Sequence, residues 1–113
     1  MKEIKAYVRD STIEEVVEAL ESSGVSGMTI THVQAILAWA DPDHFKYSLE
    51  LINKYTKVIK LELVCKDEDV SRLVDAIRIH ARTGRPGDGI IFVTDIKEVV
   101  KIRTGVTGEK ALE

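Results

Sequence analysis

Twice along this chain, a segment of alternating apolar and polar residues is followed by a segment with helical periodicity. This order constrains what the chain can fold into. Alternation of apolar and polar side chains predicts a strand with one buried face, and apolar residues at spacings of three and four predict an amphipathic helix. The segments with these patterns are the strands 2–9, 28–37, 58–65 and 90–93 and the helices 13–20 and 70–77. Their order predicts an α+β fold, a ferredoxin-like βαββαβ sandwich. A short fifth strand is expected at 99–103.

Local signals mark where the helices begin and end. Thr12 with Glu15 has the capping-box spacing, and Asp67 is a favourable N-cap for the second helix. Gly24 is expected to end the first helix, and Gly84 suits the C′ position of the second, where glycine adopts the left-handed conformation without strain.

Size, charge and cysteine content exclude several classes of protein. A chain of 113 residues predicts a single domain, 1–113, and a net charge of −3 is unlike that of a general nucleic-acid binder. No apolar run is long enough to cross a bilayer and no signal-like stretch opens the chain, so we expect a cytoplasmic protein without direct membrane insertion. Cys65 is the one cysteine, which rules out an internal disulfide and is expected to be buried and inert.

A loop rich in glycine and arginine lies between the second helix and the last strand. It reads Thr83-Gly84-Arg85-Pro86-Gly87-Asp88-Gly89. Gly87 and Gly89 leave main-chain N–H groups unobstructed, so the loop can curl around an anion. Together with the cationic segment 101–105, it is interpreted as a phosphate-binding site. The alternative is an ordinary helix-to-strand turn with solvated arginines.

Three motifs in a fixed order give the chain a family resemblance. They are Gly27-Met28-Thr29-Ile30-Thr31, Thr83-Gly84-x-x-Gly87-Asp88-Gly89 and Ile102-Arg103-Thr104-Gly105. The chain resembles the PII family of nitrogen-regulatory signal-transduction proteins from Met1 to Leu112, except at about 35–55. The resemblance implies a homotrimer that binds nucleotides in the clefts between subunits. It also implies a projecting T-loop, whose position about 38–55 occupies.

The resemblance also implies which residues contact an adenine nucleotide (ATP, ADP or AMP). Gly27, Met28 and Thr29 match the part of the family site near the base, and Val64 matches a residue that lines the adenine. The phosphate contacts match the set Gly87, Asp88, Gly89, Lys101 and Arg103. Lys101 stands where the family usually has arginine, so it keeps the charge and loses the bidentate fork.

Other matches fail. Trp39 replaces a family glutamine and Ile90 replaces a lysine, and both of those residues help to hold Mg-ATP and 2-oxoglutarate. Sensing of 2-oxoglutarate is therefore not expected. The tyrosine and serine that some members modify covalently align with Leu51 and Leu49, so both switches are absent at those positions.

The segment 38–55 departs most from the family. Asp41-Pro42 is typical of a helix start and apolar residues recur at helical spacing, so we expect it to be partly helical or packed. Trp39 or Phe45 would then serve either as an anchor for a partner or as packing against the trimer. Asp41, Asp43 and His44 could ligate a metal with His32, or could form a solvated polar loop.

Two functions of different classes remain open. The first is a regulator, not an enzyme, that senses adenine nucleotides and controls a membrane transporter or metabolic enzyme through residues 38–55. The alternative is a trimer associated with metal or ion transport, in which the nucleotide site is vestigial.

Overall fold

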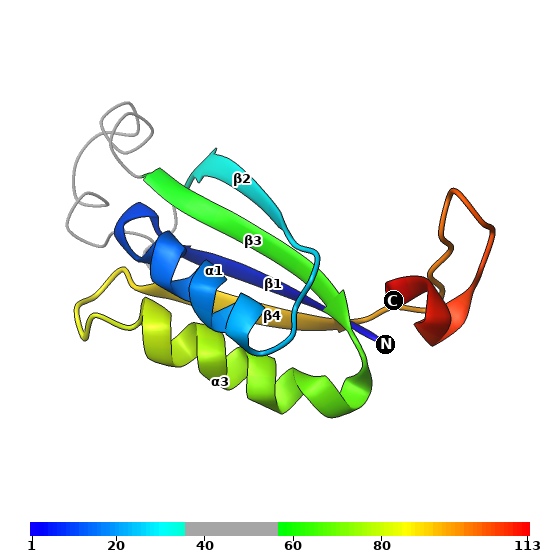
Figure 1. The fold of residues 1–113 in the computed structure, drawn as a ribbon. Coiled ribbons are helices and arrows are strands. Elements are labelled where there is room, and N and C mark those ends of the chain that lie inside the picture. The colour runs from blue at the N-terminus through cyan, green and yellow to red at the C-terminus, as the bar shows by residue number, and fades with distance from the viewer. Residues whose placement is uncertain (36–56) are drawn as a thin grey trace.

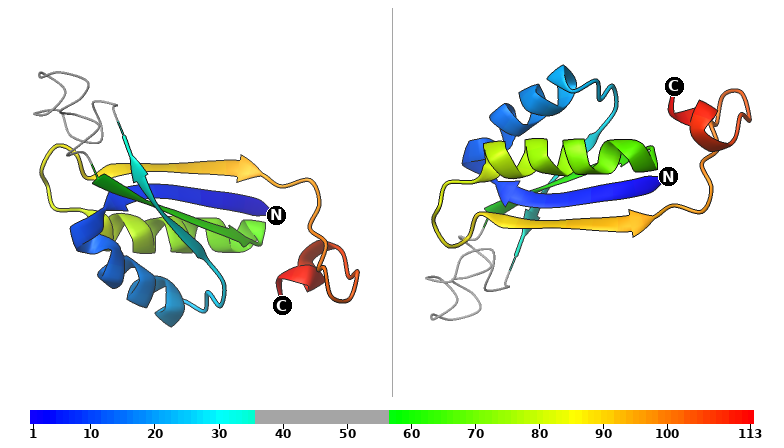
Figure 2. Two further views of the ribbon diagram at one scale, coloured as in Figure 1. Left: turned by 90° about the horizontal axis from the view of Figure 1, so that it is seen from above. Right: turned by 90° about the horizontal axis from the view of Figure 1, so that it is seen from below.

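The computed structural model describes residues 1–35 and 57–113. The described residues form a four-stranded antiparallel sheet, in the order β2-β3-β1-β4, with two helices on one of its faces (Figures 1 and 2). This is the α+β, ferredoxin-like arrangement that the sequence predicts. The elements are β1 (Lys2–Arg9), α1 (Ile13–Ser22), β2 (Thr29–Gln34), β3 (Lys57–Cys65), α3 (Val70–Ala81) and β4 (Gly89–Asp95), with 3-10 turns at Asp10–Thr12, Asp67–Asp69 and Gly108–Leu112.

The inner strand β1 sets the register of its two neighbours, β3 and β4. It pairs with β3 from Lys2↔Cys65 to Arg9↔Val58, and on its other side with β4 from Lys2↔Asp95 to Val8↔Gly89. Among residues 1–35 and 57–113, no strand pairs with the outer edges of β2 and β4. The start of β4 therefore lies beside the end of β1, where the glycine loop joins the sheet.

A single apolar layer lies between the sheet and the helices. Its members come from alternate positions of β1 and β3 and from one face of each helix, as their periodicity predicts. They are Ile4, Ala6, Val8, Val16, Leu20, Ile59, Leu61, Leu63, Cys65, Leu73, Ile77 and Ala81. No helix in the described ranges has the length and apolar character needed to cross a membrane.

Cys65 lies at the end of β3 and is buried, as expected. Its loss of solvent raises the pKa of the thiol, and the carboxylates of Asp69 and Asp67 raise it further. A thiol of this kind is protonated at neutral pH, and only the thiolate is a good nucleophile.

The first helix ends as the sequence predicts, but its start lacks the predicted side-chain cap. Gly24 has φ +93°, its N–H donates to Glu21 O at 3.0 Å, and the next N–H donates to Leu20 O at 3.0 Å, which is a Schellman motif. The capping box predicted from Thr12 is wrong. The Thr12 hydroxyl donates to Arg9 O at 3.1 Å, and a 3-10 turn precedes the helix.

The N-cap predicted at Asp67 is also wrong. The second helix begins at Val70, after a 3-10 turn in which the N–H of Asp69 donates to Lys66 O at 3.0 Å. Because the turn satisfies amides that a side-chain cap would serve, Asp67 is left to pair with the amino group of Met1 at 2.8 Å.

The fifth strand predicted at 99–103 does not form. The segment folds back on itself through one isolated bridge, Val100↔Thr107, and through the N–H of Gly105, which donates to Lys101 O at 2.8 Å. Gly105, with φ +74°, turns the chain just after this segment. The predictions for 38–55, including its helix and its metal ligands, lie outside the described residues.

Candidate functional site

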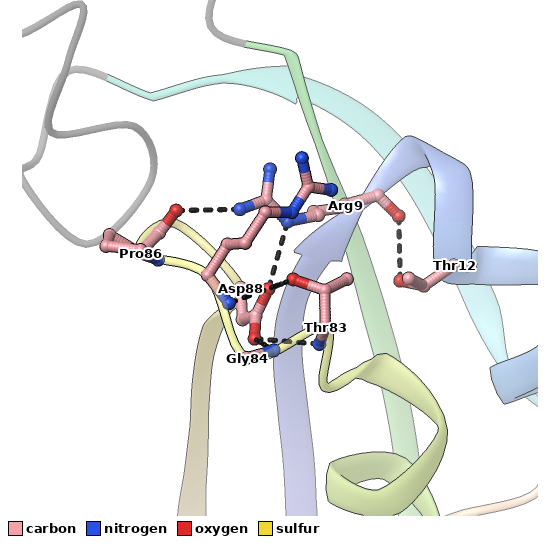
Figure 3. A network of polar contacts seen from close by, with 7 residues as sticks. Arg9, Thr12, Thr83, Gly84, Pro86 and Asp88 are labelled. Atoms are coloured by element: carbon pink, nitrogen blue, oxygen red, sulfur yellow. Dashed lines mark hydrogen bonds and ion pairs between the residues drawn. The ribbon is translucent and has the colours of Figure 1, made fainter.

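The carboxylate of Asp88 organises the loop between α3 and β4 (Figure 3). One of its oxygens accepts hydrogen bonds from the N–H groups of Thr83 at 2.8 Å and Gly84 at 3.0 Å. The other accepts from Arg9 Nε at 3.0 Å and from the Thr83 hydroxyl. Arg9 also donates through Nη2 to the main-chain oxygen of Pro86 at 2.7 Å. The loop is therefore tied to the end of β1 at two points.

These contacts decide the charge of Asp88. Partial burial alone would raise the pKa of its carboxyl. The hydrogen bonds from Thr83, Arg9 and the main chain at Thr83 and Gly84 outweigh burial and hold that pKa well below its usual range. The carboxylate is thus ionised, and its oxygens are directed at Arg9 and the loop's own amides. Asp88 can meet an incoming anion only through its main chain.

Each of the three glycines of the loop is explained by a different feature of the structure. Gly87 has φ +97°, which suits the curled main chain expected there. Gly89 has φ +118°, and a Cβ at that position would overlap the carbonyl oxygen of Tyr7 and lie 2.9 Å from its carbon. Gly89 is therefore required by the close approach of β4 to β1, a reason that the sequence does not reveal.

Gly84 has φ +87° and open space where a Cβ would be. The C-cap of α3 is Arg82, so Gly84 lies one residue beyond the C′ position predicted for it. The helix ends in an extended residue, and Gly84 turns the loop instead.

The nine predicted contact residues fall into two groups at opposite ends of the sheet. Gly87, Asp88 and Gly89 lie where β1 ends, since Gly89 pairs with Val8. The other six residues lie near the opposite end, as the register Glu3↔Val64 and the place of the C-terminal segment beyond β4 show (Figure 1). They are Gly27, Met28, Thr29, Val64, Lys101 and Arg103. Because the seven residues of β4 separate the groups by roughly 20 Å, one subunit does not bring them together.

Two members of the second group, Gly27 and Val64, line a cavity of about 320 Å³ together with Leu112 and Glu113 of the C-terminal segment. Lys101 Nζ donates to the main-chain oxygen of Glu113 at 2.7 Å. This cavity could therefore hold the base of a ligand, and the contact of Lys101 with Glu113 places one cation beside it.

Arg9 is the residue that the sequence does not reveal. It is separated from Asp88 by 79 positions, and no spacing rule connects residues so far apart. The only sequence signal is a cation at a strand end and a carboxylate in a glycine loop. Thr83 is likewise part of a recognisable motif, but its hydroxyl bond to Asp88 appears only in the fold.

The histidines that the structure describes show no metal site. Across residues 1–35 and 57–113, no group of three or more His, Cys, Asp or Glu side chains is placed to hold a metal. His32 lies exposed on β2. His80 Nδ1 lies 2.8 Å from the main-chain oxygen of Ala76 in α3.

Comparison with known proteins agrees with the fold and with the order of the motifs. The family model described as nitrogen regulatory protein P-II matches residues 1–106. A nitrogen regulatory protein P-II of Rhizobium meliloti is 37% identical over 112 residues, which cover 99% of this chain and 100% of that protein.

Two other relatives give similar values. Nitrogen regulatory protein P-II 2 of Methanothermobacter thermautotrophicus is 41% identical, with 99% of this chain and 97% of that protein covered. The Azospirillum brasilense protein P-II is 38% identical over 99% of this chain and its own full length. Both the family model and these relatives span the two groups of residues described above. The chain belongs to the P-II family of nitrogen regulatory proteins.

Proposed function

We propose that this protein is a P-II regulator that binds adenine nucleotides between subunits and thereby controls a partner protein. A regulatory, signal-transducing role follows from the family, whose members are regulators rather than enzymes. The observation that supports the nucleotide site is the loop 83–89, which is curled and tied to β1 through Arg9. A loop held by such contacts costs less to order around a ligand.

The separation of the two groups supports a site shared between copies. Gly87, Asp88 and Gly89 lie at one end of the subunit, and Lys101 and Arg103 lie near the other, so they can face one ligand only across an interface. No strand in the described part of the chain pairs with the outer edges of β2 and β4, so these edges are suited to such an interface. A closed homotrimer would place three equivalent clefts around one axis.

Sensing of 2-oxoglutarate is not part of the proposed function. Ile90 pairs with Tyr7 in the sheet and offers no cation beside the phosphate loop. A charge-assisted hydrogen bond contributes about 1.5–3 kcal/mol, so its absence weakens the binding of an anionic co-ligand by roughly tenfold or more. Nucleotide binding should therefore be independent of 2-oxoglutarate.

Calorimetric titration with ATP, ADP and AMP, each with and without 2-oxoglutarate, tests this proposal. We expect saturable binding of at least one nucleotide and no change in its Kd on adding 2-oxoglutarate. Gly87→Val should abolish binding, because a β-branched side chain blocks the approach of the phosphates to the main chain. Normal ATP binding by that variant would show that the loop is not the site. A tenfold tightening of ATP binding by 2-oxoglutarate would contradict the claim that nucleotide binding is independent of 2-oxoglutarate.

The partner is proposed to be a membrane transporter or a metabolic enzyme that binds residues 38–55. Nucleotide can control this contact only if it has different affinities for the two states of that segment. A matched titration with divalent metal ions separates this function from the ion-transport alternative. Metal binding without nucleotide binding would favour the alternative.

A further inference from the structure

Arg9 joins the side chain and the main chain of the glycine loop with one guanidinium group. Nε donates to the carboxylate of Asp88 at 3.0 Å, and Nη2 donates to Pro86 O at 2.7 Å (Figure 3). The two acceptors are two residues apart, and only a planar fork reaches both at once. Arg9 and Asp88 are 22% and 24% exposed, so their ion pair is partly shielded from water.

A carboxylate in an anion-binding loop poses an electrostatic problem. The negative charge of Asp88 repels a phosphate, and partial burial strengthens that repulsion because the local dielectric constant is below that of water. Arg9 supplies the opposite charge at contact distance. The N–H groups of Thr83 and Gly84 bind the same carboxylate and hold it on the side of Arg9.

We infer that Arg9 is a positioning residue for the phosphates of the nucleotide. It neutralises Asp88 and holds Pro86, so that the amides at Gly87 and Gly89 face the ligand without an opposing charge. It acts through the loop and does not touch the ligand. This inference rests on the proposed nucleotide site and adds a residue to it that lies on β1, outside all three family motifs.

The inference distinguishes the phosphates from the base. Loss of Arg9 should weaken binding of ATP and leave binding of adenosine unchanged, because the residues expected at the base lie at the other end of a subunit. A purely structural role, in which Arg9 only fastens the loop to β1, predicts no dependence on the charge of Asp88. Replacing that carboxylate by an amide tests the difference.

The experiment uses the full chain and four variants: Arg9→Gln, Arg9→Lys, Asp88→Asn and the double variant Arg9→Gln with Asp88→Asn. Arg78→Gln is the matched control, because Arg78 is exposed on α3 and borders the same cavity as Asp88 and Gly89, so its replacement removes the same charge near the same loop. Calorimetry gives the Kd for ATP, and saturation-transfer NMR gives the affinity for adenosine. Hydrogen exchange at the amides of Thr83 and Gly84, without ligand, reports whether the loop stays closed on Asp88.

Arg9→Gln should weaken ATP binding about tenfold or more, and faster exchange should appear at Thr83 and Gly84. Arg9→Lys should bind ATP with an affinity between those of the unaltered protein and Arg9→Gln, since lysine keeps the charge and loses the planar fork. The double variant should bind ATP more tightly than Arg9→Gln alone, because the unneutralised charge is gone. Arg78→Gln should bind like the unaltered protein.

Three results overturn the inference. Arg9→Gln that binds ATP as the unaltered protein does would show that the loop does not depend on Arg9. If the double variant binds ATP no more tightly than Arg9→Gln does, neutralising Asp88 is not the role of Arg9. If the unaltered protein binds no adenine nucleotide, the proposed function fails and the role of Arg9 with it; that outcome is distinct, because it appears before any substitution is made.

Discussion

Gly89 is the position where one methyl group should cost most. In Gly89→Ala, the new Cβ would overlap the carbonyl oxygen of Tyr7 and lie 3.3 Å from the Cα of Val8, at a φ of +118° that alanine rarely adopts. The strained dihedral costs about 1–3 kcal/mol. The start of β4 must also move away from β1, which costs about 1 kcal/mol for each main-chain hydrogen bond lost. The total is about 2–4 kcal/mol, or a fall in Tm of roughly 8–16 °C.

Gly84→Ala is the matched control for that substitution. Gly84 has a comparable φ of +87°, and nothing lies within 4 Å of the added Cβ. It should therefore cost only the dihedral strain, about 1–2 kcal/mol. Urea unfolding at one fixed protomer concentration measures both variants, since association would otherwise shift the midpoints. If Gly89→Ala is as stable as Gly84→Ala within about 0.5 kcal/mol, the argument from close approach is wrong.

Three further predictions concern acid stability, thiol reactivity and the long connecting segment. The folded-state pKa of Asp88 lies below its ordinary value of 3.8, so its contribution to stability is complete above that value and is lost as pH falls through the folded-state pKa. The difference in unfolding free energy between the unaltered protein and Asp88→Asn should be constant from about pH 5 to pH 7 and shrink only below about pH 4; shrinkage already near pH 6 would contradict this. Cys65, which is 7% exposed, should react with a thiol reagent only after unfolding in urea, and rapid labelling of the native protein would refute its burial. Deletion of residues 43–53 should leave Tm nearly unchanged and abolish partner binding, since β2 and β3 pair from Thr29↔Glu62 to Gln34↔Lys57 without it; large destabilisation would place the segment in the core.

The sequence predicts the four strands and two helices of this fold and errs at the helix caps and in the segment 99–103. Periodicity locates all four strands and both helices, because burial of one face is a property of many residues at once. Helix starts depend on a few local hydrogen bonds, and at Thr12 and Asp67 a 3-10 turn takes the place of the expected side-chain cap. The residues after Val99 show the same limit, since the turn at Gly105 closes a hairpin where alternation suggests a strand.

The candidate site could be predicted only in part, and the reason differs from the one that applies to the helix caps. Motifs name the residues, and the fold shows that Gly89 and Arg103 lie toward opposite ends of one subunit. Spacing along a chain carries no information about which copy supplies which residue. Nor could it connect Arg9 with Asp88, because contacts between residues so far apart depend on the register of β1 against β4.

A mixing experiment tests most directly the central claim that the site is shared between copies. Gly87→Val blocks the phosphate loop, and Arg103→Ala removes the cation at the other end of the subunit. A trimer made of either variant alone should therefore not bind ATP. Denatured and refolded together in equal amounts, the two variants should regain about a quarter of the ATP sites of the unaltered protein, because each mixed trimer has one cleft with both halves intact. No recovery of binding in trimers shown to be mixed would contradict the account and place the site within a single subunit.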